Sequence, residues 1–63
     1  MYTPAAGDIL QKFDRRVIVE EVTKESVFFR IDDMSDDAGK WHKKRDQFIA
    51  EVLRMQPRLV KRG

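Results

Sequence analysis

The sequence predicts a mainly β domain with one short C-terminal helix, arranged as a small antiparallel barrel that is partly open. Two segments, 16–22 and 27–31, alternate apolar and polar residues and contain many of the β-branched side chains that favour strands. A chain of 63 residues forms one small domain with a thin core. Its sheet must therefore curl, or accept the helix as a lid, to bury its apolar face.

The N-terminal part is expected to form an arm, a strand and a turn. Residues 1–6 have no periodic pattern and Pro4 disfavours a helix, so they are interpreted as a flexible arm. A single barrel domain then covers residues 7–60. It begins with a short strand over 9–13, followed by a turn that contains residues 14–15.

The two clearest strands define the expected core. In the first, alternation places Val17 and Val19 on one face, and Ile18 and Val22 on the other. In the second, it places Phe28 and Arg30 opposite the predicted core face, which consists of Val27, Phe29 and Ile31. A polar segment of four residues between them suits a hairpin connection.

The C-terminal part is expected to form a loop, a strand and the helix. Residues 32–39 are rich in acids and end in glycine, which is typical of a loop. Residues 40–44 suit a short strand with Trp41 turned inward. The helix is predicted over residues 46–55, with Asp46 as its N-terminal cap and its apolar face formed by Phe48, Ile49, Val52 and Leu53.

The chain after this helix is short. Pro57 cannot continue the helix, so the helix should end near Met55. Leu59 and Val60 suit a last short strand, and residues 61–63 form a basic tail.

Three segments in order resemble a Src-homology-3-like barrel of the Tudor or KOW type. They are Gly7-Asp8-Ile9-Leu10, then 16–22, then 27–31, and the resemblance extends over about residues 7–45. It implies a non-catalytic domain that binds nucleic acid or protein through its loops and an edge strand. The chain lacks the interior glycine of the KOW motif and has a longer late helix, so no binding residue is transferred from the family. In size and style the chain also resembles short bacteriophage and prophage proteins.

Charge is distributed unevenly along the chain. Residues 1–39 contain five basic residues and nine acidic ones, whereas residues 40–63 contain eight basic residues and two acidic ones. Basic clusters of this kind can neutralise phosphates and release their counterions. The first hypothesis is therefore nucleic-acid binding through a patch that consists of Lys40, Trp41, Lys43, Lys44, Arg45, Arg54, Arg58 and Lys61.

Trp41 has two interpretations that the sequence leaves open. If it is exposed beside the cations, it can stack on a nucleic-acid base. If it is buried, it supplies the large apolar area that a small core needs. Phosphate contacts by the neighbouring Lys and Arg side chains are compatible with both interpretations.

The alternative hypothesis is a protein-interaction module, such as a phage-type inhibitor or adaptor of a host protein. The acidic loop residues Asp32, Asp33, Asp36 and Asp37 can imitate nucleic-acid phosphates in another protein's site. An apolar strand face with Phe28, Ile18 and Val22 opposite the core would also suit a partner or a homodimer.

Several classes of function are not expected. The chain has one His, no Cys and three Gly, so neither a catalytic site nor a phosphate-binding glycine-rich loop is indicated, and no metal or cofactor is expected. The acidic loop does not match a calcium-binding loop. No signal peptide or membrane-spanning run is seen, so a cytoplasmic protein without a membrane partner is the expectation.

Overall fold

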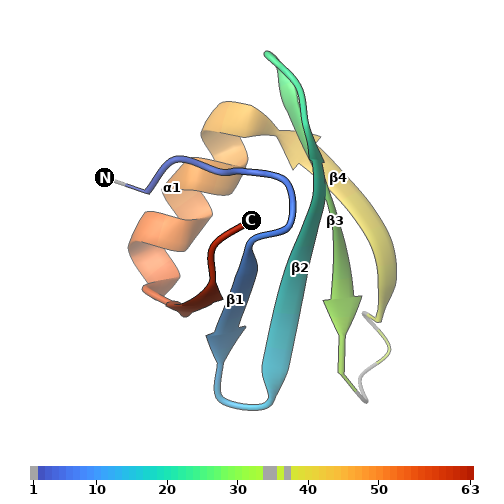
Figure 1. The fold of residues 1–63 in the computed structure, drawn as a ribbon, viewed down its shortest axis with the longest axis vertical. Coiled ribbons are helices and arrows are strands. Elements are labelled where there is room, and N and C mark those ends of the chain that lie inside the picture. The colour runs from blue at the N-terminus through green and yellow to red at the C-terminus, as the bar shows by residue number, and fades with distance from the viewer. Residues whose placement is uncertain (1, 34–35, 37) are drawn as a thin grey trace.

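Five strands and one helix make up the computed structural model, which describes residues 2–33, 36 and 38–63 (Figure 1). In chain order the elements are β1 (Ile9–Lys12), β2 (Arg15–Val22), β3 (Ser26–Asp32), β4 (Gly39–Lys44), α1 (Arg45–Met55) and β5 (Arg58–Lys61). All strand pairs are antiparallel, in the order β4-β3-β2-β1-β5. The prediction of a mainly antiparallel β fold with one short late helix is confirmed, and the sheet is not closed.

The core lies between α1 and one face of the sheet. Phe48 of α1 packs against Phe29 of β3, with 5.2 Å between the ring centroids. The predicted core face of β3 is confirmed, and the buried apolar side chains are Leu10, Val19, Val27, Phe29, Ile31 and Phe48. The predicted apolar face of the helix is only partly buried, since Leu53 is 47% exposed.

The prediction that Val22 shares a face with Ile18 is wrong. The register between β2 and β3 shifts between Val19 and Glu21, so one residue of β2 has no partner at that point. Such a bulge turns the side chains beyond it onto the other face. Val22 therefore lies opposite the buried Val27 and packs against the core, instead of facing outward beside Ile18.

The β1–β2 turn is one residue earlier than expected. Phe13 and Asp14 form it, and Arg15 already pairs with Lys12. Phe13 has a left-handed φ of 54° and its side chain is 87% exposed. The Lys12 ammonium lies 5.8 Å from the centre of its ring.

The residues that cap the two ends of α1 differ from those predicted. The N-cap residue is Lys44, without a side-chain cap, while Asp46 lies in the first turn, where its charge suits the helix dipole. At the other end Gln56 adopts a left-handed conformation before Pro57. Lys12 donates a hydrogen bond to the carbonyl of Met55 at 2.5 Å, which joins β1 to the C-terminus of α1.

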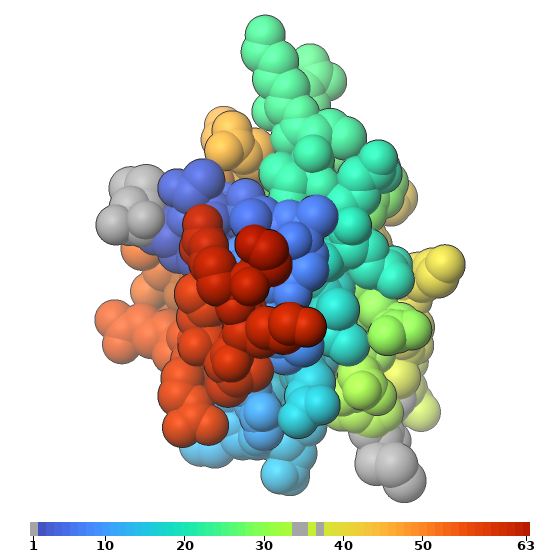
Figure 2. All heavy atoms as spheres, viewed as in Figure 1, coloured from blue at the N-terminus to red at the C-terminus, as the bar shows by residue number. Residues whose placement is uncertain are grey.

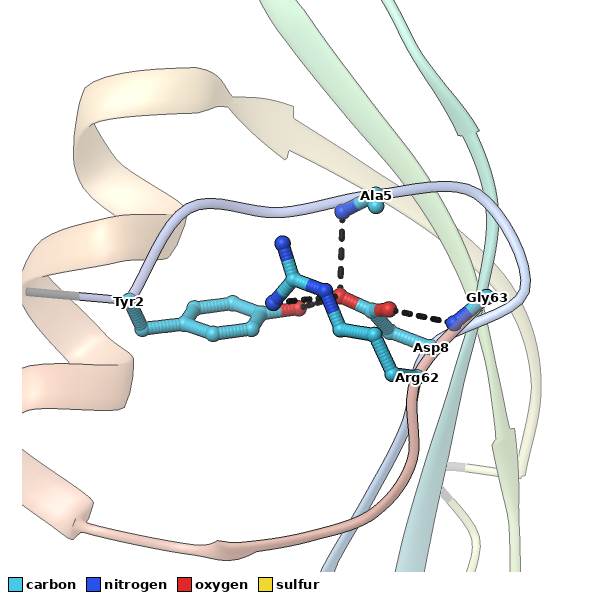
Figure 3. A network of polar contacts seen from close by, with 5 residues as sticks. All are labelled: Tyr2, Ala5, Asp8, Arg62 and Gly63. Carbon is cyan, nitrogen blue, oxygen red and sulfur yellow. Dashed lines mark hydrogen bonds and ion pairs between the residues drawn. The ribbon is translucent and has the colours of Figure 1, made fainter.

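Asp8 joins the two ends of the chain (Figure 3). Its carboxylate is fully buried and accepts hydrogen bonds from the hydroxyl of Tyr2 at 2.6 Å, from the amide of Ala5 at 3.0 Å and from the amide of Gly63 at 2.9 Å. An Arg62 guanidinium nitrogen lies 3.9 Å from it. Figure 2 shows the C-terminal residues lying against the N-terminal segment.

These contacts correct the expected flexible arm and basic tail. Tyr2 packs against the core and Pro4 is buried, so the segment before Gly7 is part of the fold. Lys61 ends β5, and Gly63 lies so close to the N-terminal segment that a Cβ there would collide with the carbonyl oxygen of Ala6. Gly63 is therefore required by the close approach of the two ends.

The network also sets the protonation of its members. Burial by itself would raise the pKa of Asp8, but the hydrogen bonds from Tyr2, Gly63 and Ala5 and the charge of Arg62 lower it below its ordinary value. Burial, the hydrogen bond to Asp8 and the charge of that carboxylate raise the pKa of Tyr2, against the effect of Arg62. The pair is therefore a charged acceptor and a protonated donor at neutral pH.

Asp8→Asn should lower the free energy of unfolding by about 2 kcal/mol, because an amide group replaces a carboxylate oxygen that accepts hydrogen bonds in a buried site. Urea denaturation followed by circular dichroism measures this change. Asp36→Asn, on an exposed turn residue, is the matched control and should shift stability by less than about 0.5 kcal/mol. Equal stability of the two variants would contradict the role given to Asp8.

The stability of the protein should also decrease in acid because of Asp8. Its folded pKa lies below the unfolded value of about 3.9, so the unfolded chain binds the proton first as pH falls. The contribution is complete above about pH 5 and is lost as pH falls through the folded pKa. Urea denaturation at several pH values between about 7 and 3 should show a difference between wild type and Asp8→Asn that narrows with acidity. A constant difference would be inconsistent with this titration.

Candidate nucleic-acid interface

The face of the sheet opposite α1 is uncovered in the part of the chain that the structure describes (Figure 1). Residues paired across antiparallel strands project from the same face, so the register shows which side chains meet there. One row crosses all five strands and consists of Lys61, Ile9, Ile18, Arg30 and Lys40. Its centre is apolar and its ends are basic.

A second row lies next to the first, toward the β1–β2 turn. It contains Arg58, Gln11, Arg16 and Asp32, one from each of four strands. Toward the other end of the sheet, Glu21 pairs with Phe28, Phe28 pairs with His42, and Ser26 pairs with Lys44. We call this set of positions the uncovered face.

Basic side chains predominate on the uncovered face. The register places six cations there against two acids, Glu21 and Asp32; the cations are Arg16, Arg30, Lys40, Lys44, Arg58 and Lys61. All six are exposed. Within residues 2–33, 36 and 38–63, none of them forms an ion pair. Their charges are therefore directed to solvent and to any anion that approaches.

An aromatic pair lies among these cations. The ring centroids of Phe28 and His42 are 5.7 Å apart and the rings are tilted by 33°. Phe28 is 37% exposed. Along the strands, the Arg30–Lys40 pair lies two residues to one side and Lys44 two residues to the other.

Two cations on the helix side of the sheet have carboxylate partners. Lys43 contacts both carboxylate oxygens of Glu51 at 2.6 Å. Arg15 forms an ion pair with Asp33 at 2.9 Å, and Lys12 bonds the Met55 carbonyl. Lys12, Arg15, Lys43 and Glu51 line a mainly apolar cavity of about 130 Å³ between α1 and the sheet. Arg15 and Lys43 are therefore held by partners within the domain, whereas Lys12 bonds an uncharged carbonyl and keeps its net charge.

The structure divides the basic patch that the sequence predicted. Lys40, Lys44, Arg58 and Lys61 lie on the uncovered face, although they come from opposite edges of the sheet. The remaining predicted residues do not join them. Trp41 and Lys43 lie on the helix side of β4, Arg45 begins α1, and Arg54 is in its last turn.

The position of Trp41, which the sequence left open, lies between the two alternatives. It pairs with Phe29 and so lies on the same face as the core, but it is 45% exposed. The reason is that β4 is an edge strand and α1 covers its helix side only in part.

Two cations of the uncovered face were not among the predicted site residues. Alternation already placed Arg30 opposite the core, and extending the alternation of residues 17–19 back by one residue puts Arg16 on the face of Ile18. The sequence therefore already indicated that Arg16 and Arg30 point away from the core. What was missing is the pairing that brings Arg16 and Arg30 into rows with Arg58 and Lys40.

The structure also places the acidic residues of the predicted loop in different surroundings. Asp33 pairs with Arg15, Asp32 ends β3 on the uncovered face, and Asp36 is exposed. Asp37 lies outside the described residues. Among the residues that the structure describes, no group of His, Asp and Glu side chains is arranged to hold a metal ion.

Comparison of the chain with models of protein families, with curated protein sequences and with solved structures finds no match. The single helix among the described residues is too short and too polar to cross a bilayer.

The exposure of Trp41 can be measured directly because it is the only tryptophan. Its fluorescence should be red-shifted relative to a buried tryptophan and should be quenched by acrylamide, since nearly half of its surface is open to solvent. Blue, shielded emission would contradict the position of β4 at the edge of the sheet.

Proposed function

We propose that this protein is a small non-catalytic module that binds nucleic acid through the uncovered face of its sheet. The observation that carries the proposal is the set of six exposed, unpaired cations that β2, β3, β4 and β5 contribute among the described residues, with an aromatic pair among them. Cations that neutralise phosphates release counterions, and this term dominates affinity for nucleic acid. An open, positively charged face suits such a partner better than it suits an apolar one.

The proposed contacts differ from the basic patch inferred from sequence. Lys43 is occupied by Glu51, and Trp41 lies on the helix side, so neither is assigned a contact here. Arg16 and Arg30 replace them. The proposal therefore concerns the uncovered face and not the edge of β4 alone.

The same proposal extends to the type of fold. A four-strand meander, a bulge in the long β2 and a fifth strand that returns beside β1 support a partly open relative of the Src-homology-3-like barrels. Bulges of this kind bend a strand and increase its twist, which is how such sheets begin to close. In this interpretation α1 covers the side on which a closed barrel has its interior.

Charge reversal of Arg30 and Lys40 together should weaken binding by more than about tenfold at low salt. The two residues are cross-strand partners of like charge, so the double change keeps the repulsion between them and should not alter the fold. The slope of log affinity against log salt should become shallower by about two. Fluorescence anisotropy of a labelled oligonucleotide over a series of salt concentrations measures both quantities.

The matched control reverses Lys24 and Arg54, which are exposed and lie off the uncovered face. It makes the same change in net charge and should weaken binding far less. Equal loss in the two variants would mean that only net charge matters. Absence of binding by the wild type at low salt would exclude the function.

The alternative, a protein-interaction module, makes a different prediction. Under it, a protein partner should be retained after nuclease treatment and its binding should not depend on Arg30 and Lys40. If reversing Asp36 to Lys then abolished that binding, the acidic segment would be the contact. Under the nucleic-acid proposal, nuclease should remove whatever the protein retains.

A further inference from the structure

The Phe28–His42 pair is the one place among the described residues of the uncovered face where aromatic rings lie beside cations. Phe28 and His42 are direct cross-strand partners on β3 and β4, and their rings are in contact. The chain has four Phe, of which Phe29 and Phe48 build the core. Phe28 lies on the opposite side of β3 and adds nothing to that core.

The charges around the pair are arranged asymmetrically. On the β2 side Phe28 has the carboxylate residue Glu21 as its partner, whereas on β4 His42 lies between Lys40 and Lys44. Residues two apart on a strand are separated by about 6.6 Å, so the cations flank the rings closely. An anionic chain that lies over the rings would therefore place its phosphates toward β4 and away from Glu21.

Such a site discriminates between single strands and duplexes. Bases of a single strand can turn outward and stack on an aromatic side chain, and every base has a face that suits this contact. In a duplex the base faces are occupied by their neighbours, so only phosphates and base edges are accessible without unstacking.

We infer that Phe28 and His42 form a base-stacking platform, and that the protein binds single-stranded nucleic acid in preference to duplex. This inference rests on the proposed function and names the class of nucleic acid that the same face takes. Lys40, Lys44 and Arg30 hold the phosphates on either side of the stacked base. Because stacking is tolerant of base identity, little sequence preference is expected.

The test compares a labelled oligothymidine with a blunt duplex of the same length, by fluorescence anisotropy with the full-length protein. Wild type should bind the single strand at least about tenfold more tightly. Phe28→Ala should lose about tenfold in affinity for the single strand, since the stacking surface is removed. It should leave the salt slope unchanged, because no phosphate contact is removed.

Phe13→Ala is the matched control, since it removes the same ring from a more exposed position at the β1–β2 turn. Its affinity should equal that of the wild type. Phe28→Trp keeps a stacking surface and should restore binding, whereas Phe28→Leu keeps apolar bulk and should not. This last pair decides the question if Phe28→Ala fails to fold.

The outcomes separate this inference from the proposed function. If wild type binds the single strand with a steep salt dependence but Phe28→Ala and Phe28→Leu bind equally well, the platform is wrong and the basic face stands. Tighter binding of the duplex than of the single strand would likewise overturn the platform alone. If wild type binds neither nucleic acid at low salt, both proposals fail together.

Discussion

A buried carboxylate connects the ends of this chain, and the arrangement of the sheet depends on it. The strands β2, β3 and β4 are consecutive in the chain and adjacent in the sheet, so local hairpins align them. β5 comes from the far end of the chain and all four of its residues are exposed, so it buries little that could hold it in place. Besides the backbone pairing of β5 with β1, Asp8 holds this end of the chain, because it accepts hydrogen bonds from Gly63 beyond β5 and from Tyr2 and Ala5 before β1.

The candidate interface depends on the same contact. Arg58 and Lys61 reach the uncovered face only because β5 lies beside β1. A domain of this size has little apolar area with which to fix a short edge strand. A buried charge that is satisfied by three donors gives the strand a defined position, since leaving those donors unpaired would be costly.

The two faces of the sheet differ in whether their cations have carboxylate partners. On the helix side, Arg15 and Lys43 have carboxylate partners, and Lys12 bonds a helix carbonyl. On the uncovered face the cations outnumber the acids and face solvent. Cations such as Lys40 and Lys61 on the two edge strands also discourage another strand from pairing there. One set of side chains thus protects the edges and creates the positive face.

Local periodicity in the sequence was enough to identify the main elements and to predict the buried face of residues 27–31, whereas long-range contacts settled which of the outward side chains meet. Alternation in 27–31 identified Val27, Phe29 and Ile31 as core, and it separated Arg30 and Phe28 from that core, because side chains two residues apart on a strand share a face. The bulge that moves Val22 into the core and the edge position of β4 that leaves Trp41 half exposed have no such periodic signal. Arg16 and Lys61 share a face because the strand order places β5 beside β1. The role of Asp8 was hidden for the same reason, since its partners lie at both ends of the chain and come together only when the sheet has formed.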